Sequence, residues 1–421
     1  MSMRGKRLLL TGGTNFIQDI LDFSRENGIV LITTGNIKDT VLKRYADEQY
    51  DVDTSDVDAM TELVKKAHID GIFAGGNETN IAAAIQVTQK LGLPYYCNQQ
   101  QWDTLMNKAT FKSLCRKYDI PVTREYPIHT LEDLREPIPD IRYPVVVKPV
   151  DSCGSQGVCY CSSFEELKDA AEKAIAYSSR QRILVEEYAA GDEISATYTI
   201  CNGNITLSCI KGKYPVGEQE GLKNLPSVYL YPSKHLDRYL SEVNDKMIRM
   251  LKSLHLQYGA LFVQGIFDDQ GIRIFEAGFR PGGTNDFRYT DMMNHVNHLH
   301  LLIEQALTGK VKDDPTVRDN PRFRQVCCSY TMCARGGKVA SVNGLDNLKD
   351  GRIKTIEQFY HPGDTVPFGQ TLAQRMLRFF IEADTLQETA RVIDGIQDSV
   401  TVCDEEGRSI LYSRFDTSRI L

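Results

Sequence analysis

Residues 143–158, YPVVVKPVDSCGSQGV, contain the most informative pattern in the chain. The run of β-branched residues favours a strand. The loop after it contains Gly154 and Gly157, whose small size lets backbone N–H groups approach an anion closely. Lys148 lies within the apolar run, where a charge without a partner would be costly to bury. The pattern therefore predicts a strand lysine and a glycine loop that together bind an anion such as a phosphate group.

A second polar cluster follows in residues 182–198, RILVEEYAAGDEISATY. Glu186 and Glu187 stand at the end of a strand pattern, and Glu193 comes after a turn of small residues. Backbone groups and one carboxylate of such a hinge can contact the edge of an adenine, and another carboxylate can accept ribose hydroxyls. Solvated acids at a strand end would give the same pattern, so the residues alone leave both interpretations open.

A third cluster occupies residues 272–287, IRIFEAGFRPGGTNDF. Glu276 and Arg280 lie four residues apart where a strand ends, and the Pro-Gly-Gly sequence forces a turn just beyond them. The carboxylate could hold Mg²⁺ against a triphosphate, and the arginine could neutralise charge on a phosphoryl group in transfer. A surface ion pair at a loop is the alternative.

The first 100 or so residues have a different texture. Residues 6–10 form an apolar run, which is followed by a glycine turn, a helical pattern over residues 16–27 and another apolar run. This order recurs near residue 70, and it predicts an open parallel sheet with helices on its faces. Gly12 and Gly13 lack the G-x-G-x-x-G spacing, so we interpret them as a structural turn or a substrate edge rather than a dinucleotide site.

The composition excludes several classes of protein. The 421 residues carry a net charge of −7 and contain no basic stripe, so nucleic acid is not expected as a partner. No run approaches the roughly 20 apolar residues of a membrane span, and the N-terminal apolar run is too short for a signal peptide; we therefore expect no membrane partner and a cytoplasmic protein. The eleven cysteines indicate reduced thiols, and neither Cys159 with Cys161 nor Cys327 with Cys328 completes a zinc site.

Five motifs occur along the chain: NKATFK (107–112), VVVKPVDSCGSQGV (145–158), VEEYAAGDE (185–193), YGALFVQGIF (258–267) and FEAGFRPGG (275–283). Their order and spacing resemble those of the ATP-grasp superfamily, in its branch of carboxylate–amine ligases, the L-amino acid ligases and biotin carboxylase-like proteins.

The resemblance implies a mixed α/β and α+β fold in three parts. Residues 1–106 would form a Rossmann-like domain with an open parallel sheet. Residues 107–320 would form the two-lobe ATP-grasp domain, in which residues 143–190 are the smaller lid lobe, and residues 321–421 would form a small C-terminal α+β domain.

The resemblance also implies ATP as cofactor, with Mg²⁺ or, in its place, Mn²⁺. It makes Lys148 and Arg280 catalytic, the second as the group that stabilises an acyl phosphate, and Glu276 a metal ligand. It assigns ATP contacts to lysines, loop residues, hinge residues and one strand amide: Lys108, Lys148, Ser152, Gly154, Ser155, Gly157, Glu186, Glu187, Tyr188, Glu193 and Gln264.

Two positions depart from the family pattern. Gln264 stands where a first metal-binding acid is usual, and Gly278 stands where the pattern Glu-x-Asn would have asparagine. An amide binds Mg²⁺ less well than a carboxylate does, and glycine has no side-chain ligand. Asp268 is about 13 Å further along the strand from Gln264, too far to replace it. The sequence therefore predicts a metal site held mainly by Glu276 and the nucleotide.

Substrate contacts are predicted on two segments. Lys211 and Lys213 lie in CIKGKYP, which in this family borders the substrate cavity, and Arg288 follows the glycine turn, where it could pair with a carboxylate. The histidines at 295, 298 and 300 lack a third metal ligand at the right spacing, so we expect them to cap the helix and lie at its surface.

The favoured function is an ATP-dependent ligase that activates a carboxylate as an acyl phosphate and joins it to an amine, with a small-molecule carboxylate and amine as substrates. Related proteins are often dimers, so a homodimer is expected. Three alternatives stay open. A non-catalytic or regulatory ATP-binding relative is favoured by Gln264 and Gly278. A carboxylase acting on bicarbonate would need a biotin-carrier partner, and a nicotinamide oxidoreductase lacks its fingerprint.

Overall fold

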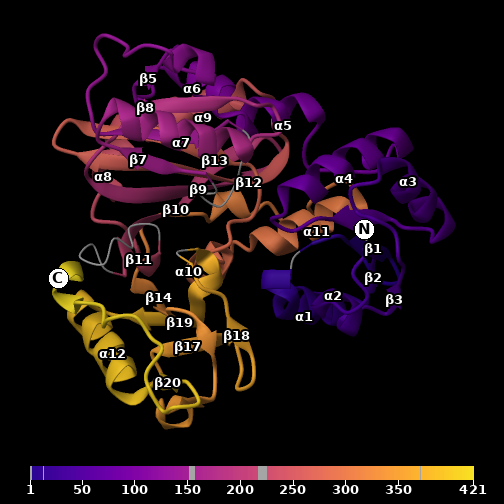
Figure 1. The fold of residues 1–421 in the computed structure, drawn as a ribbon. Coiled ribbons are helices and arrows are strands. Elements are labelled where there is room, and N and C mark those ends of the chain that lie inside the picture. Colours follow the sequence, from indigo (N-terminus) through magenta and orange to yellow (C-terminus); the bar gives the residue numbers. More distant parts are fainter. Residues whose placement is uncertain (1, 13, 151–156, 217–224, 370) are drawn as a thin grey trace.

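The computed structural model describes residues 2–12, 14–150, 157–216, 225–369 and 371–421. Three of the residues predicted to contact ATP, namely Ser152, Gly154 and Ser155, lie outside these ranges. Figure 1 shows the N-terminal unit beside a larger body, whose small lobe lies above the long sheet and whose C-terminal part lies below it. The predicted α/β and α+β fold is confirmed, with one parallel sheet and two antiparallel sheets of four or more strands.

The N-terminal unit is built on a four-stranded parallel sheet in the order β3-β2-β1-β4. Leu8, Leu9 and Leu10 are all buried, because helices cover both faces of the sheet. The strands are β1 (Arg7–Leu10), β2 (Val30–Thr33), β3 (Glu48–Gln49) and β4 (Gly71–Phe73), and the helices are α1 (Ile17–Asn27), α2 (Val41–Tyr45), α3 (Val57–Lys66), α4 (Glu78–Leu91) and α5 (Gln99–Met106).

Gly12 and Gly71 are required by close backbone contacts. A Cβ at Gly12 would lie 2.1 Å from the carbonyl oxygen of Ala74, which agrees with the interpretation of this glycine as a structural turn. A Cβ at Gly71 would lie 2.4 Å from the carbonyl oxygen of Ala306, where the later helix α11 (His298–Thr308) packs on β4. The N-terminal unit is therefore fixed to the rest of the chain by direct packing.

The small lobe is an antiparallel sheet of order β5-β8-β6-β7 with one helix packed on it. In this sheet Lys148 pairs with Leu184 on the neighbouring strand. The lobe has a hydrophobic core of its own, separate from the main core. Its elements are β5 (Glu125–Tyr126), β6 (Val145–Pro149), β7 (Cys159–Cys161), α7 (Phe164–Ala176) and β8 (Ile183–Glu187).

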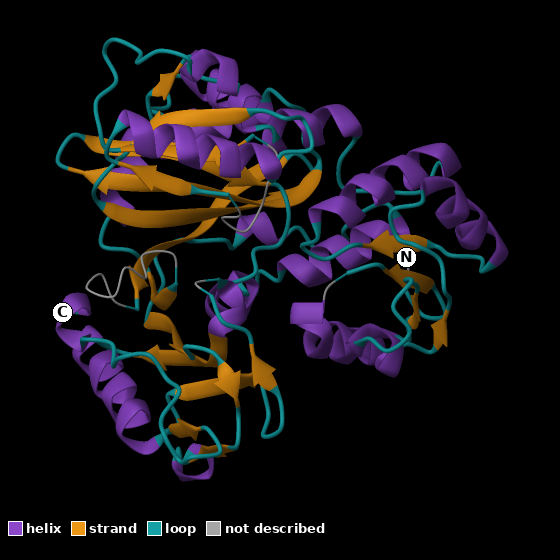
Figure 2. Cartoon of the chain, in the orientation of Figure 1, coloured by secondary structure: helices purple, strands orange, loops and turns teal. Residues whose placement is uncertain are grey.

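The long sheet is antiparallel throughout and continues into the C-terminal part of the chain (Figure 2). The predicted domain boundary at residue 320 falls in the connection before β14, yet β14 pairs directly with β11 across it. In spatial order the strands are β13 (Gly271–Gly278), β12 (Tyr258–Asp268), β9 (Asp192–Cys201), β10 (Asn204–Pro215), β11 (Pro226–Tyr231), β14 (Val326–Cys333), β19 (Arg375–Ala383) and β17 (Ile353–Gln358).

Helices and short strand pairs complete this body. With α11, the helices are α6 (Lys108–Lys117), α8 (Leu236–Tyr239), α9 (Asp245–Lys252), α10 (Asp286–Asn294) and α12 (Leu386–Ser399), and the strand pairs are β15 (Gly337–Lys338) with β18 (Thr365–Val366) and β16 (Ser341–Asn343) with β20 (Thr401–Cys403).

Two sequence predictions can be compared with the described residues directly. No helix among them is long and apolar enough to cross a membrane. The ten cysteines that the structure describes are all free thiols, eight of them buried, as expected for reduced cysteines.

Candidate functional site

A cavity of about 380 Å³ lies between the small lobe and the long sheet, and Asn15 and Glu78 of the N-terminal unit also line it. All three motif clusters contribute side chains to it, although they are up to 130 or so residues apart in the sequence. The predicted residues that line it are Lys108, Lys148, Glu186, Glu187, Tyr188, Glu193, Lys211, Lys213, Gln264, Glu276 and Arg280.

Two buried lysines share one carboxylate at the small-lobe side of the cavity. The Nζ atom of Lys148 lies 2.9 Å from Oε1 of Glu186, and Lys112 donates a short hydrogen bond to the same oxygen. Burial by itself would raise the pKa of Glu186, but the two lysines hold it below its ordinary value. Glu125 is a more distant second carboxylate for Lys112, at 3.6 Å. Lys148 therefore faces the cavity and shares its counter-ion, Glu186, with Lys112. This arrangement suits the binding of an additional anion.

Lys112 was missed in the sequence, although it ends the NKATFK motif one helical turn after Lys108. Its side chain is completely buried, and Thr123 also accepts a hydrogen bond from it at 2.6 Å. The spacing of four residues on α6 was a usable signal, because it places both lysines on one face of the helix.

The other two hinge acids have partners of their own. Glu187 accepts a hydrogen bond from Nη1 of Arg273 at 3.0 Å. Glu193 accepts one from Nζ of Lys213 at 2.7 Å. Both carboxylates nevertheless line the cavity, where they remain within reach of a ligand.

The predicted metal ligand is Glu276, and Gln264 stands where a first metal-binding acid is usual. These residues are direct cross-strand neighbours on β13 and β12, and both side chains line the cavity. Glu276 Oε1 lies 3.2 Å from Nζ of Lys108. Among the described residues there is no group of three or more His, Cys, Asp or Glu side chains that could hold a metal. One carboxylate and one amide oxygen therefore fit Mg²⁺ that is shared with nucleotide phosphates and water, the usual mode for this ion, but not a complete protein cage.

Gly278 is explained by the aromatic ring opposite it. A Cβ at this position would lie 2.2 Å from the ring of Phe262, its cross-strand partner. The guanidinium of Arg280 lies over the same ring, 5.1 Å from its centroid. The ring thus occupies the space that an asparagine side chain would need, and it supports Arg280.

Arg280 does not pair with Glu276. Its Nη2 and Nε atoms donate to Oε1 of Glu78, at 3.0 and 3.1 Å, and Glu78 is the first residue of α4 in the N-terminal unit. Glu78 also lines the cavity and was missed in the sequence, where 202 residues separate the two partners. No local signal could have connected them.

Lys211 is held in a buried ion pair with Asp286. Its Nζ atom lies 2.7 Å from both carboxylate oxygens, and Tyr231, Thr284 and Thr197 also donate to this carboxylate. Burial would raise the pKa of Asp286, but Lys211 and these hydrogen bonds lower it to about 2. Lys211 therefore reaches the cavity with its charge already neutralised.

Arg288 is not among the residues that line the cavity. It forms ion pairs with Asp19 in α1, at 2.9 Å, and with Glu357 in β17, at 3.1 Å. It therefore connects the N-terminal unit to the long sheet.

The expectation that the histidines lie at the surface is wrong for His298, which is buried and hydrogen-bonded to Thr199 at 2.7 Å. His300 is partly buried and stacks on Phe23. Both residues face inward because α11 packs between β4 and β12.

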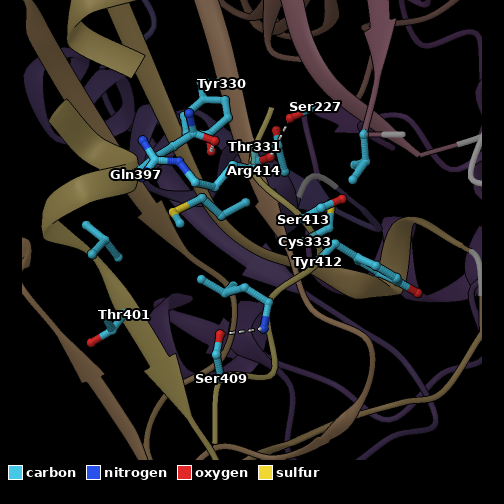
Figure 3. A pocket seen from close by; sticks show the side chains of 14 residues that line it. Ser227, Tyr330, Thr331, Cys333, Gln397, Thr401, Ser409, Tyr412, Ser413 and Arg414 are labelled. Carbon is cyan, nitrogen blue, oxygen red and sulfur yellow. Dashed lines mark hydrogen bonds between the residues drawn. The ribbon is translucent and has the colours of Figure 1, made fainter. Parts of the chain in front are cut away.

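A smaller cavity of about 200 Å³ lies within the C-terminal part, between β14, the end of α12 and residues 409–414 (Figure 3). Its larger polar side chains are already engaged. Gln397 contacts Tyr330, Phe415 and Asp394, and Arg414 pairs with Asp398. We assign no role to it.

Residues 114–244 match the family model of the D-ala D-ala ligase C-terminus. The chain is 24% identical over 280 residues to the carbamoyl phosphate synthase large chain of Clostridium acetobutylicum, an alignment that covers 65% of this chain and 24% of that protein. The chain thus spans about a quarter of the length of this relative.

Solved structures match over nearly the whole chain. An L-amino acid ligase from Bacillus licheniformis has a TM-score of 0.78 at 17% identity, covering 96% of this chain and 99% of that one. The biotin carboxylase domain of 2-oxoglutarate carboxylase from Hydrogenobacter thermophilus, solved with MgADP and bicarbonate, has a TM-score of 0.73 at 15% identity, covering 94% and 90%. These solved structures have the same fold as this chain over nearly its whole length, and the family model of the D-ala D-ala ligase C-terminus matches residues 114–244 within it.

Proposed function

We propose that this chain is an ATP-dependent ligase that joins a carboxylate to an amine and releases ADP and phosphate. The observation that supports this most directly is the shared cavity. It is lined by Lys148 and Glu186 of the buried lysine–carboxylate cluster, by the cross-strand pair of Glu276 and Gln264, and by Arg280. Anion binding, metal retention and charge neutralisation thereby meet in one space.

The reaction solves a simple chemical problem. A carboxylate is a poor electrophile, and transfer of the γ-phosphoryl group to one of its oxygens creates an acyl phosphate with a good leaving group. The amine then attacks the carbonyl carbon, the C–O bond to phosphate breaks, and the amine loses a proton. The protein's part is to position the reactants and to offset negative charge.

Residues of this chain have distinct parts in that process. Lys148 and Lys108 bind phosphate oxygens. Arg280, oriented by Glu78 and by the ring of Phe262, neutralises charge at the carboxylate and its acyl phosphate. Glu276 and Gln264 would hold Mg²⁺, which supplies Lewis-acid charge against the triphosphate when bound. The similar biotin carboxylase domain was solved with MgADP, which supports a magnesium-bound nucleotide as the ligand of the cavity.

A second candidate is an ATP-binding protein without ligase activity. The single carboxylate in the metal site and the absence of a side chain at Gly278 favour it. It would bind ATP tightly but release no ADP in response to substrates.

The first experiment measures ADP release with ATP and Mg²⁺ against panels of carboxylates and amino acids, with hydroxylamine present to trap an acyl phosphate as a hydroxamate. Substrate-dependent ADP with a matching hydroxamate supports the ligase and identifies its carboxylate. Tight ATP binding without ADP release across the panels supports the second candidate.

A variant tests the cavity itself. Lys148→Ala should lower kcat/KM for ATP by about 10- to 100-fold, because a charge-assisted contact to phosphate is lost. The fold should survive, since Lys112 still neutralises Glu186. Lys173→Ala, at an exposed position on α7, is the matched control. Unchanged ATP affinity and rate in Lys148→Ala would contradict the proposed site.

A further inference from the structure

The cations that line the main cavity are neutralised with one exception. Seven described lysines and arginines line it, and six of them have a carboxylate within 3.2 Å. The pairs are Lys108 with Glu276, Lys148 with Glu186, Lys211 with Asp286, Lys213 with Glu193, Arg280 with Glu78 and Arg378 with Glu357. The seventh cation, Arg375, forms no ion pair with any described residue.

Arg375 is fixed in place although it lacks an anionic partner. It is the first residue of β19, and its Nε atom donates to the carbonyl oxygen of Leu372 at 2.9 Å. Its guanidinium lies over the ring of Phe359, 4.7 Å from the centroid. Neither Nη atom donates a hydrogen bond to a described residue. One edge of a rigid, planar donor group is therefore held without a partner at the cavity wall.

The surroundings of Arg375 favour a bound anion. Burial and the nearby charge of Arg378 lower the pKa of Arg375, against the opposite effect of Tyr229 and Glu357. The hydroxyl-bearing residues Tyr229, Thr331 and Thr371 also line the cavity. An anion beside Arg375 would relieve the repulsion between the two arginines and would find further donors around it.

Arg375 also lies on the side of the reacting centre. Its neighbour on β19, Arg378, donates from Nη1 to the carbonyl oxygen of Gly283 at 2.9 Å. Gly283 ends the turn that follows Arg280. In contrast, the lysines assigned to phosphate lie on β6 and α6, at the small-lobe side.

We propose that Arg375 binds a substrate carboxylate other than the one that is activated. A carboxylate presents two coplanar oxygens that match the guanidinium edge, and a single positive charge suits one carboxylate better than a polyphosphate. The substrate class is then an amino acid, whose α-carboxylate stays free when its amine is the acceptor, or a dicarboxylic acid, whose second carboxylate stays free when the first is phosphorylated. This inference rests on the proposed ligase function, because that function makes the bound carboxylate a substrate. Binding of the carboxylate to Arg375 can still be measured without any ligase activity.

Binding is measured first, without turnover. The protein is saturated with the non-hydrolysable analogue AMP-PNP and Mg²⁺ and titrated with each L-amino acid, with succinate and with glutarate, each beside its carboxamide counterpart. At least one carboxylate should bind wild type more tightly than its carboxamide does. Arg375→Gln should weaken that binding about 10- to 100-fold, and Arg375→Lys should lose less, since it keeps the charge but not the fork.

Two controls accompany the titrations. Arg391→Gln removes an exposed arginine from α12 in the same part of the chain and should change nothing. Affinity for AMP-PNP should be equal in Arg375→Gln and wild type, which separates a missing substrate contact from a general fault in the cavity. If no carboxylate probe binds wild type, or if Arg375→Gln binds every probe as wild type does, the proposal is overturned.

Turnover then distinguishes the two sources of the carboxylate. With hydroxylamine as acceptor only the activated acid is a substrate, so a defect of Arg375→Gln that persists in hydroxamate formation assigns the arginine to a dicarboxylic acid. A defect that appears only with an amino-acid acceptor assigns it to the acceptor. Arginine-dependent carboxylate binding without any ADP release would support this inference while contradicting the ligase function.

Discussion

The two sides of the cavity handle charge in opposite ways. At the small-lobe side, Lys112 and Lys148 share the carboxylate of Glu186, and the next carboxylate, that of Glu125, is 3.6 Å from Lys112. At the opposite side, Lys211, Lys213 and Arg378 each have a carboxylate, whereas Arg375 has none among the residues that the structure describes. The first arrangement suits a polyanion such as a triphosphate, whereas the second presents one unpaired donor group to a smaller ligand.

This difference implies that the small-lobe side contributes affinity for the nucleotide, whereas the opposite side contributes selectivity among substrates. Two lysines that share one close carboxylate can attract a polyphosphate without a precise geometric match. A wall of neutralised pairs attracts little, so one unpaired arginine can determine which substrates bind, because a ligand that leaves it without a partner loses a charge-assisted contact.

Breaking the pairing at the substrate side should have the largest effect. Asp286→Asn leaves the Lys211 ammonium buried without its counter-charge, which should lower the free energy of unfolding by about 3–5 kcal/mol. Chemical denaturation of wild type and variant measures this. Glu186→Gln is the comparison at the small-lobe side, and there AMP-PNP should restore stability because its phosphates replace the lost charge. If AMP-PNP restores the stability of Asp286→Asn as well as that of Glu186→Gln, the two sides of the cavity do not differ in how they handle charge.

The ion pair of Lys211 with Asp286 should also make the stability of the protein depend on pH. The pKa of Asp286 is about 2 in the folded chain against an ordinary value of 3.8, so its ionised form contributes stability above pH 3.8. That contribution, about 2 kcal/mol, is lost as the pH falls from 3.8 towards 2. Wild type should therefore lose this stability over that interval, and Asp286→Asn should not. Parallel acid dependence in both proteins would contradict the assignment.

Removing the positive charge of Arg280 should impair catalysis rather than folding. Arg280→Gln should lower kcat by about 10²- to 10³-fold with little change in KM for ATP, because the arginine acts on the reacting carboxylate. Glu78→Gln keeps the arginine and loses its orienting carboxylate, so a smaller loss is expected. Hydroxamate formation measures both. A loss confined to ATP affinity would place Arg280 with the nucleotide-binding side.

A steric change at the metal site should have the smallest effect. Gly278→Asn brings a side chain into the ring of Phe262, and such overpacking should cost about 1–3 kcal/mol. Phe262→Ala made together with Gly278→Asn should recover part of that stability and lower the Mg²⁺ concentration needed for AMP-PNP binding. Thermal unfolding and Mg²⁺ titrations check both expectations. If Gly278→Asn is as stable as wild type, the ring does not account for the glycine.

The fold and most of the charged residues that line the cavity could be predicted from the sequence, because strand patterns, glycine turns and motif order are local properties. The residues that were missed share a different feature. Glu78 pairs with Arg280 across 202 residues, and Lys112 pairs with Glu186 across 74. Arg375 reaches the cavity because the long sheet continues past the predicted boundary at residue 320.

By itself, the sequence determined the order of strands and turns that brings Lys148, Glu276 and Arg280 to one cavity, since hydrophobic periodicity and glycine positions act over a few residues. Only the tertiary structure decided which carboxylate neutralises which cation, because ion pairing depends on distances between side chains from separate elements. It also decided that Arg375 is the one cation among the described cavity-lining residues that has no carboxylate partner. A sequence records each charge, but the distance between two charges exists only once the chain has folded.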